Sequence, residues 1–268
     1  MEASPARPLA VVTGASSGIG LELARQFAGH GFDLVVCAED SAIVGAAAEL
    51  KGHGVAVEAV QADLAQAAGV EQLHQRITED GRPIDAIALN AGIGAGGAFA
   101  SDTDLGQELR LVDLNCRSTV HLAKLVVPGM VASGRGRLLF TSSIASTMPG
   151  SFQAVYNASK SFVQAFALAL REELKDTGVT VTSLMPGPTD TEFFERAHML
   201  DTKVGATDQK DDPADVARMG FEALMAGKER VVAASLMTKV QGRASRFVPD
   251  RVKAVMHRRM AEPGSGDG

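Results

Sequence analysis

The sequence predicts an α/β fold with one doubly wound parallel sheet of about seven strands and helices on both faces. Short β-branched runs alternate with helical patterns along the chain, and a glycine-rich turn follows the first run. Such alternation favours parallel pairing through right-handed crossovers, which place helices on both faces. Aromatic residues make up only 4% of the chain, so the core is predicted to consist of Ala, Val, Leu, Ile and Met.

Each predicted strand is a short run of mostly apolar or β-branched residues, and each predicted helix has apolar residues at helical spacing. In chain order the strands are Leu9–Thr13, Asp33–Cys37, Val55–Val60, Asp85–Leu89, Arg137–Thr141, Val179–Leu184 and Arg230–Ala233. The helices between them are Ile19–Gly29, Ser41–Lys51, Ala67–Thr78, Leu105–Val131, Ala154–Asp176 and Pro213–Met225. Asp212 before Pro213 predicts a capped start of the last helix, and Gly178 predicts the end of the helix before it.

Length and composition limit the classes of protein to which the chain can belong. The chain has 268 residues, of which 46% are hydrophobic, and a formal charge of −6, which argues against general nucleic-acid binding. Cys37 and Cys116 stand apart and are expected to be buried thiols, and no histidine has metal-ligand spacing. Without an apolar leader or spanning segment, the protein is expected to be soluble and cytoplasmic, with no metal.

The only tyrosine, Tyr156, lies four residues before Lys160 at the start of a predicted helix. Positions i and i+4 share a helix face, so the phenol and the ammonium can act on one bound molecule. A nearby cation favours the phenolate, which predicts a Tyr156 pKa lowered towards the range of general acid/base catalysis. A surface pair that shares a face by chance is the alternative.

The glycine-rich turn runs from Thr13 through Gly14, Gly18 and Gly20 into a helix. Glycines in a strand-to-helix turn let a pyrophosphate approach the helix N-terminus, so the turn predicts a dinucleotide site of the Rossmann type. The spacing differs from the plain Gly-x-Gly-x-x-Gly pattern, and a merely structural turn is the alternative.

These motifs occur in an order that resembles the short-chain dehydrogenase/reductase family, of the Tyr-x-x-x-Lys type, over about residues 9 to 233. They are the glycine turn, Asn90-Ala91-Gly92, Asn115, Ser143 and Tyr156-x-x-x-Lys160. The resemblance implies an NAD(P)-dependent oxidoreductase that moves hydride between a nicotinamide cofactor and a secondary alcohol or ketone.

The resemblance also implies roles for individual residues. Tyr156 exchanges a proton with the substrate oxygen, and Lys160 holds the nicotinamide ribose and lowers the tyrosine pKa. Ser143, with Ser142 as its rival, binds the substrate oxygen, and Asn115 anchors a water in a proton relay. The implied cofactor contacts are Gly14, Ser16, Ser17, Gly18, Ile19, Gly20, Glu39, Asp63, Leu64, Asn90, Ala91, Gly92, Tyr156, Lys160, Pro186, Gly187, Thr189 and Thr191.

The residues after the second predicted strand bear on the choice of cofactor. Glu39 and Asp40 are both acidic, Ser16 and Ser17 are neutral, and no basic residue nearby in the sequence offers to neutralise a 2′-phosphate. A ribose 2′-hydroxyl prefers a carboxylate, so the sequence favours NAD over NADP.

A substrate lid is predicted at about residues 187–211, within a domain that covers residues 1–234. Met148, Phe152 and the segment from Glu192 to Leu200 predict either an apolar substrate pocket or simple packing of the lid.

Residues 235–268 are predicted to be a basic helical extension that ends in a flexible tail after Glu262. Its cations are Lys239, Arg243, Arg246, Arg251, Lys253, Arg258 and Arg259, and its apolar stripe is Val252, Val255, Met256 and Met260. The stripe is expected to pack on the body or a partner subunit, with contact to anionic lipid as the alternative. Further apolar residues on the Tyr156 helix, together with the family resemblance, imply a homodimer or homotetramer.

A second class of function stays open from the sequence, a dinucleotide-binding sensor or scaffold without turnover. The presence of all four residues Asn115, Ser143, Tyr156 and Lys160 favours the enzyme, because a sensor has no chemical need for them.

Overall fold

The computed structural model describes residues 7–233 and 248–267. Seven parallel strands form one sheet in the order β3-β2-β1-β4-β5-β6-β7. The strands are β1 (Leu9–Thr13), β2 (Asp33–Ala38), β3 (Val57–Gln61), β4 (Ala86–Leu89), β5 (Gly136–Thr141), β6 (Val179–Pro186) and β7 (Arg230–Ala233). The predicted doubly wound sheet is confirmed, with strand ends that differ by at most two residues from the predicted ones.

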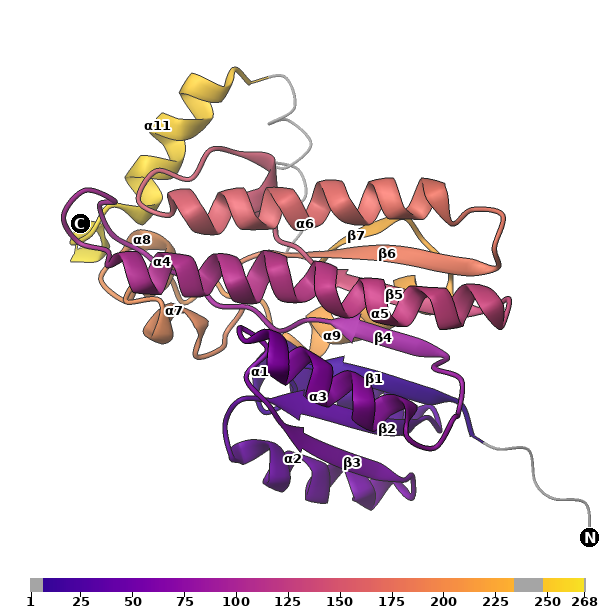
Figure 1. The fold of residues 1–268 in the computed structure, drawn as a ribbon. Coiled ribbons are helices and arrows are strands. Elements are labelled where there is room, and N and C mark those ends of the chain that lie inside the picture. The colour runs from indigo at the N-terminus through magenta and orange to yellow at the C-terminus, as the bar shows by residue number, and fades with distance from the viewer. Residues whose placement is uncertain (1–6, 234–247, 268) are drawn as a thin grey trace, which may run out of the picture.

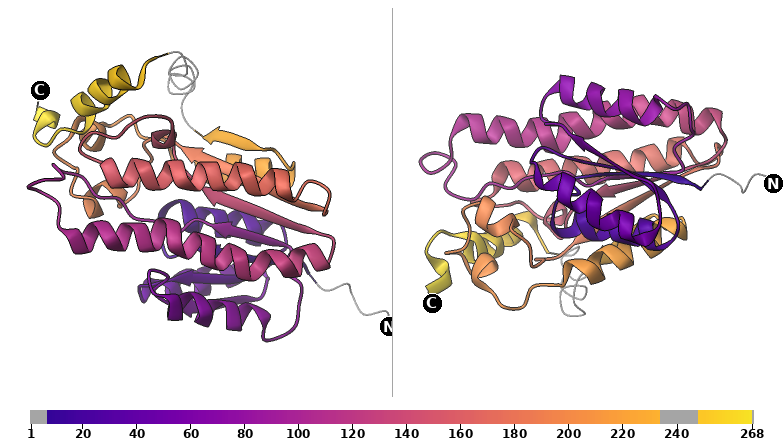
Figure 2. Two further views of the ribbon diagram at one scale, coloured as in Figure 1. Left: turned by 45° about the horizontal axis from the view of Figure 1, so that its top comes forward. Right: turned by 90° about the horizontal axis from the view of Figure 1, so that it is seen from below.

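The helices cover both faces of the sheet, as the right panel of Figure 2 shows. The main ones are α1 (Gly18–Gly29), α2 (Ala42–Leu50), α3 (Ala67–Thr78), α4 (Leu105–Val112), α5 (Ser118–Ala132), α6 (Ala154–Glu173) and α9 (Pro213–Met225). Helices α1, α2 and α9 bury one apolar core against the sheet, and α3, α5 and α6 bury another on the opposite face. These cores contain mainly Val, Leu, Ile and Ala, as the composition predicts.

Two predicted helices differ from the observed ones by more than a residue at an end. The predicted helix Leu105–Val131 is α4 and α5 joined by a π-helical turn, Asp113–Arg117. The predicted helix Ala154–Asp176 ends at Glu173 in α6, before Gly178, which has a φ of +78°. The predicted cap of α9 is confirmed, because Asp212 Oδ1 accepts a hydrogen bond from the Ala214 amide at 2.8 Å.

The site lies at the point in the sheet where the strand order reverses, between β1 and β4. Strand β1 pairs with β2 on one side and with β4 on the other, so the connections that follow β1 and β4 leave in opposite directions. Ligands of open α/β sheets bind at this switch point, beyond the carboxyl ends of the strands. The glycine turn follows β1 at this edge, and α6 begins just after the loop that follows β5 (Figure 1).

The lid and the C-terminal segment lie together beside the N-terminal end of α6 (Figure 1). The lid holds two short helices, α7 (Phe193–Arg196) and α8 (Lys203–Ala206), and α11 (Asp250–Ala261) packs against α8.

The tail after α11 departs from the prediction of a flexible end. The amide of Gly266 donates to the carbonyl oxygen of Asp201 at 2.8 Å, and the amide of Gly264 donates to its carboxylate at 2.8 Å. These bonds tie the short helix Ser265–Asp267 to the lid. The predicted domain boundary at residue 234 and the cations Lys239, Arg243 and Arg246 lie outside the described residues.

Candidate functional site

The glycine turn forms a cradle that only glycine fits. Gly14 and Gly18 have φ values of +66° and +54°, which side-chain-bearing residues rarely adopt. A Cβ on Gly20 would lie 1.9 Å from the carbonyl oxygen of Gly14, and one on Gly14 would lie 2.9 Å from the Ala91 Cα. The close backbone brings the free amides at the start of α1 to the surface of the turn, where a pyrophosphate is favoured.

Asn90 ties three strand ends together beneath this turn. Its side-chain amide donates to the carbonyl oxygen of Thr13 at 3.1 Å, and its Oδ1 accepts from the Thr141 hydroxyl at 3.0 Å. The amides of Asn90 and Ala91 both donate to the Thr13 hydroxyl at 3.0 Å. The side chain of Asn90 therefore fixes the sheet edge, and the predicted contact of this segment to a ribose stays a prediction.

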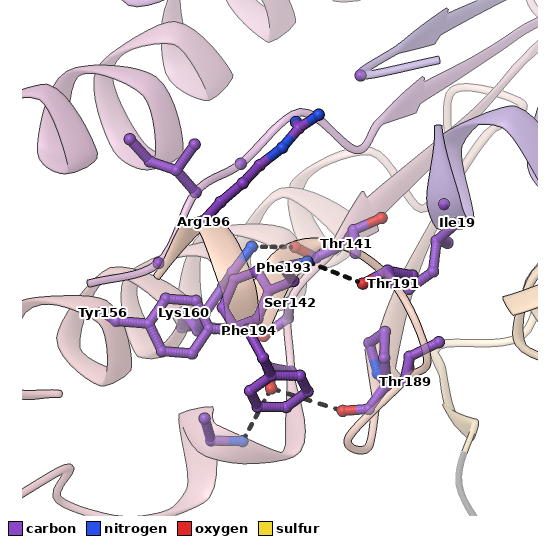
Figure 3. A pocket seen from close by; sticks show the side chains of 18 of the residues that line it. Ile19, Thr141, Ser142, Tyr156, Lys160, Thr189, Thr191, Phe193, Phe194 and Arg196 are labelled. Carbon is purple, nitrogen blue, oxygen red and sulfur yellow. Dashed lines mark hydrogen bonds between the residues drawn. The ribbon is translucent and has the colours of Figure 1, made fainter. Parts of the chain in front are cut away.

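Tyr156 and Lys160 share one face of α6, and both are buried. Lys160 Nζ lies 5.8 Å from the centre of the Tyr156 ring and donates to the carbonyl oxygen of Thr141 at 3.0 Å. Figure 3 shows the two side chains next to each other, with Phe193 from the lid close by. The chance pairing of two surface residues is therefore excluded.

The two serines after β5 have separate tasks. The hydroxyl of Ser142 donates to the main-chain carbonyl of Lys160 at 2.9 Å, which joins β5 to α6. Ser143 caps the following turn by accepting from the Ala145 amide at 3.1 Å, and its hydroxyl donates to the Pro186 carbonyl at 3.5 Å. Its side chain also interacts with that of Tyr156. Both serines line the cavity, and Ser142 in addition joins β5 to α6, so the predicted role of Ser143 at the substrate oxygen stays a prediction.

Burial controls both titrating groups at the site. It raises the pKa of Tyr156 to about 12, against a smaller lowering effect of the hydrogen bond with Ser143. It also lowers the pKa of Lys160 to about 8. The predicted lowering of the tyrosine pKa by the lysine is therefore wrong for the cofactor-free protein, because removal of water destabilises the phenolate and the ammonium alike.

Asn115 lies in the π-helical turn between α4 and α5 and is buried. Its side-chain amide donates to the Ile93 carbonyl at 2.9 Å, and its Oδ1 accepts from the Ile93 amide at 3.0 Å. A Cβ on Gly92 would lie 3.1 Å from both Asn115 Oδ1 and Lys160 Nζ, so Gly92 separates the two residues. Asn115 is the one predicted site residue that does not line the cavity.

The acidic residues at the far end of the site have a cationic partner that sequence reasoning missed. Arg110 on α4 forms ion pairs with Glu39 and with Asp63, the latter at 3.0 Å. Burial is the largest single influence on the pKa of Asp63 and raises it, but the hydrogen bonds from Arg110 and the Ala65 amide and the charge of Arg110 together leave this pKa lowered. Asp40 instead accepts from the Ser16 hydroxyl at 2.8 Å. Arg110 is 71 residues from Glu39 in the chain, so only the tertiary structure reveals this neighbour.

The segment after β6 closes the opposite wall. Thr189 folds back on Gly187 through a hydrogen bond of 2.9 Å from its hydroxyl to the carbonyl oxygen. A Cβ on Gly18 would lie 3.0 Å from Thr191 Cγ2, which places this segment against the glycine turn. Figure 3 shows Thr189 and Thr191 on the side of the pocket where Ile19 lies.

A cavity of about 630 Å³ joins these parts. Apart from Asn115, every predicted catalytic and cofactor residue lines it. The glycine cradle, the acidic residues beyond β2 and the segment after β6 therefore fit an extended dinucleotide whose nicotinamide end reaches Tyr156. Among the described residues, no group of three or more His, Cys, Asp or Glu side chains is arranged to hold a metal ion.

Some of the apolar residues predicted for the lid region line the cavity, and others pack within the lid. Met148, Phe193 and Phe194 line the cavity, and the ring of Phe193 lies 5.2 Å from that of Tyr156. Met199 is fully buried in the lid core, and Leu200 is exposed. The lid therefore provides both an apolar wall and its own packing.

The apolar stripe of α11 is not packed on the body of the chain, and the predicted alternative of packing on a partner subunit stays a prediction. The stripe Val252, Val255, Met256 and Met260 is exposed, while His257 and Ala261 are buried. Met256 and Met260 also line the cavity, together with Lys253 and His257. Neither Lys253 nor His257 was predicted to line the cavity, although their i, i+4 spacing places them on one helix face.

Comparison with known proteins agrees with this geometry. A family model described as short chain dehydrogenase matches residues 8–199. The 1-deoxy-11-beta-hydroxypentalenate dehydrogenase of Streptomyces exfoliatus is 36% identical over 223 residues, which cover 80% of this chain and 78% of that protein.

Two solved structures are similar over nearly the whole fold. A short-chain dehydrogenase from Sphingobium yanoikuyae in complex with NADPH has a TM-score of 0.79 at 29% identity, covering 90% of this chain and 96% of that one. The bulky-bulky ketone specific alcohol dehydrogenase from Comamonas testosteroni has a TM-score of 0.75 at 26% identity, covering 90% and 99%.

The chain belongs to the short-chain dehydrogenase family. It is an NAD(P)-dependent oxidoreductase that acts on CH–OH and C=O groups of small molecules, and the alternative of a sensor or scaffold is not favoured. No helix among the described residues is long and apolar enough to cross a membrane.

Proposed function

We propose that this protein interconverts a secondary alcohol and a ketone of apolar character, with Tyr156 as the general acid and base. The observation that carries the proposal is the meeting of Tyr156, Ser143 and Lys160 in one cavity with the glycine turn. The nicotinamide of the bound cofactor supplies or accepts the hydride.

Tyr156 exchanges the proton with the substrate oxygen, and Ser143 assists it. In reduction, the phenol of Tyr156 donates its proton to the carbonyl oxygen as hydride reaches the carbon, and in oxidation the proton returns. Because the pKa of Tyr156 is raised by burial, the phenol holds its proton until the reacting oxygen takes it. Ser143 donates a hydrogen bond to the same oxygen and stabilises its developing charge.

Lys160 and Asn115 complete the proposed machinery. Lys160 has a pKa lowered to about 8, so its ammonium gives up and regains a proton near neutral pH. We assign it to proton exchange with Tyr156 and to the ribose hydroxyls, and we assign Asn115 to a water that leads to Lys160.

For the cofactor we propose NAD in preference to NADP. Glu39 and Asp40 both line the cavity beyond β2, where a ribose 2′-hydroxyl finds acceptors and a 2′-phosphate meets negative charge. Two observations favour NADP instead. Arg110 is a cation next to Glu39, and the similar Sphingobium yanoikuyae enzyme was solved in complex with NADPH.

The apolar lining of the cavity supports a ketone or alcohol substrate of apolar character. Phe193 and Phe194 from the lid, Met148 from the loop after β5 and Met256 from α11 line the cavity. The ketone named for the similar Comamonas testosteroni enzyme agrees with a roomy apolar site.

We also propose a homo-oligomer in the cytoplasm. Large apolar side chains are exposed on α4, α5 and α6, among them Leu105, Leu109, Val120 and Phe162. Such a surface favours burial against a second copy. Both cysteines are free, as a reducing compartment would leave them.

The experiment is a titration of the purified protein with NADH and, separately, NADPH, followed by nucleotide fluorescence. No tryptophan is present to overlap with the signal. Binding of NADH tighter than NADPH, followed by turnover of apolar ketones, supports the proposal. Tighter NADPH binding contradicts the preference for NAD, and the absence of turnover with a broad ketone and alcohol panel contradicts the catalytic roles.

A further inference from the structure

Helix α11 forms a wall of the cavity on the side of the catalytic tyrosine. His257 Nδ1 hydrogen-bonds to the carbonyl oxygen of Ser151 at 2.9 Å, and the Ser151 hydroxyl donates to the Ala254 carbonyl at 3.0 Å. Ser151 precedes α6 by only three residues, so α11 is anchored to the loop that leads to Tyr156. Ala261 packs into the lid core.

Lys253 lies on the cavity face of this helix. Its side chain is only 13% exposed, and Nζ forms an ion pair of 3.1 Å with Asp250, whose side chain is 79% exposed and does not line the cavity. Water screens the exposed carboxylate of Asp250 and so weakens its attraction to Lys253. A carboxylate that enters the cavity can therefore replace Asp250 at little cost.

The charges around Lys253 favour an anion. The acids that line the cavity are Glu39, Asp40 and Asp63 at the adenosine end and Glu192 on the lid side. Glu192 is already paired with Arg196 one helical turn later. No acid among the cavity-lining residues is therefore paired with Lys253.

His257 adds a neutral polar edge next to this cation. Burial lowers its pKa, so the ring is neutral, and Nδ1 carries the proton donated to Ser151. Nε2 then remains as an acceptor, so the imidazole adds no charge that would compete for an anion.

We propose that the substrate of this dehydrogenase carries a carboxylate at the end remote from its reacting carbon, and that Lys253 binds this carboxylate. The inference rests on the proposed function, because it names the substrate class of the same site. The apolar residues Phe193, Met256 and Met260 then enclose the carbon chain between the two polar ends.

The test compares oxo acids of medium chain length with their methyl esters, which share the ketone and lack the charge. Wild-type protein is expected to favour the acid in kcat/KM by about tenfold to a hundredfold, the worth of a charged hydrogen bond. Lys253→Met is expected to remove this preference through a higher KM for the acid, with the ester and the affinity for NADH unchanged. Lys253→Arg is expected to retain it.

Lys175→Met is the matched control, since Lys175 is in an exposed pair with Glu172 at the same i, i+3 spacing in the segment that follows α6. An acid-to-ester ratio that stays the same in Lys253→Met, a wild-type preference for the ester, or a loss of NADH affinity in that variant overturns the inference.

Absence of turnover for both compounds is a failure of the proposed function instead. In that case the binding of acid and ester to the NADH complex, measured by nucleotide fluorescence, decides the inference. A preference for the acid that depends on Lys253 upholds it, and equal binding overturns it.

Discussion

The ammonium nitrogen of Lys160 lies 5.8 Å from the centre of the Tyr156 ring, and neither side chain is open to solvent. At this separation the two groups share one buried environment, which shifts the pKa of each in the direction that favours its neutral form. The lysine pKa of about 8 and the tyrosine pKa of about 12 both follow from this burial. At neutral pH the phenol of Tyr156 therefore keeps its proton, while Lys160 lies close to the pH at which it titrates.

Replacement of Tyr156 by Phe tests the general acid/base directly. We expect kcat to fall by at least about 10²-fold, because the only phenol in the chain is lost. The affinity for NADH is expected to stay within about twofold, since the Phe ring keeps the contact with Phe193. Steady-state kinetics and nucleotide fluorescence measure both quantities. Retention of most of the turnover would show that another group moves the proton.

The pKa of Tyr156 can be read by its own absorbance, because it is the only tyrosine and there is no tryptophan. In the cofactor-free protein we expect little phenolate signal up to about pH 11, since burial raises the pKa to about 12 from its ordinary value of 10. Between these values the unfolded chain releases a proton that the folded protein keeps, so the free energy of unfolding falls as pH rises.

Tyr156→Phe is the blank for this titration and is expected to remove the contribution of the phenol to the fall in stability. Ionisation of the folded wild-type protein at about pH 10 would contradict the dominance of burial.

The effect of adding a methyl group is expected to differ strongly between Gly20 in the glycine turn and Gly45 in α2. In Gly20→Ala the new Cβ would lie 1.9 Å from the Gly14 carbonyl oxygen, so the turn must shift. We expect a loss of about 1–3 kcal/mol in the free energy of unfolding and at least about tenfold weaker nucleotide binding. Gly45→Ala in α2 meets no atom within 4 Å and is expected to stabilise the helix by about 0.5–1 kcal/mol.

Chemical denaturation and nucleotide titration of both variants measure these effects. If Gly20→Ala bound NADH like the wild type, the glycine turn would not be the pyrophosphate site.

The fold was predictable from the sequence because the seven strands are short, apolar and separated by well-marked turns. The exact end of α6 could not be predicted, because the helix ends at Glu173 and Gly178 lies at the end of the loop that leads to β6. The meeting of Tyr156, Lys160 and Ser143 in one cavity was predictable because the first two share a helix turn and Ser143 follows the end of a strand.

The residues that sequence reasoning missed act across long distances in the chain. Arg110 meets Glu39 across 71 residues, and His257 meets Ser151 across 106. No local pattern records such contacts. The face of α11 that packs on the body was also missed, because the stripe of Val252, Val255, Met256 and Met260 is exposed in the single chain while His257 and Ala261 are buried.

Arg110 provides the last prediction, on the choice between NADH and NADPH. Its guanidinium neutralises part of the negative charge of Glu39 and Asp63. In Arg110→Gln both carboxylates lose this partner, so a 2′-phosphate meets more repulsion while a 2′-hydroxyl still finds acceptors. We expect the affinity for NADPH to fall about three- to tenfold relative to that for NADH, a modest effect because the pairs are partly exposed to solvent.

Glu39→Gln is the opposing control for Arg110, since it removes a negative charge from the same end of the cavity. It is expected to shift the ratio of the two dissociation constants towards NADPH, and nucleotide fluorescence measures the ratio in both variants. If Arg110→Gln instead improved NADPH binding relative to NADH, the guanidinium would act by obstructing the subsite and not by its charge. If Glu39→Gln left the ratio unchanged, the carboxylate would not face the ribose, and the charge argument for NAD would lose its main residue.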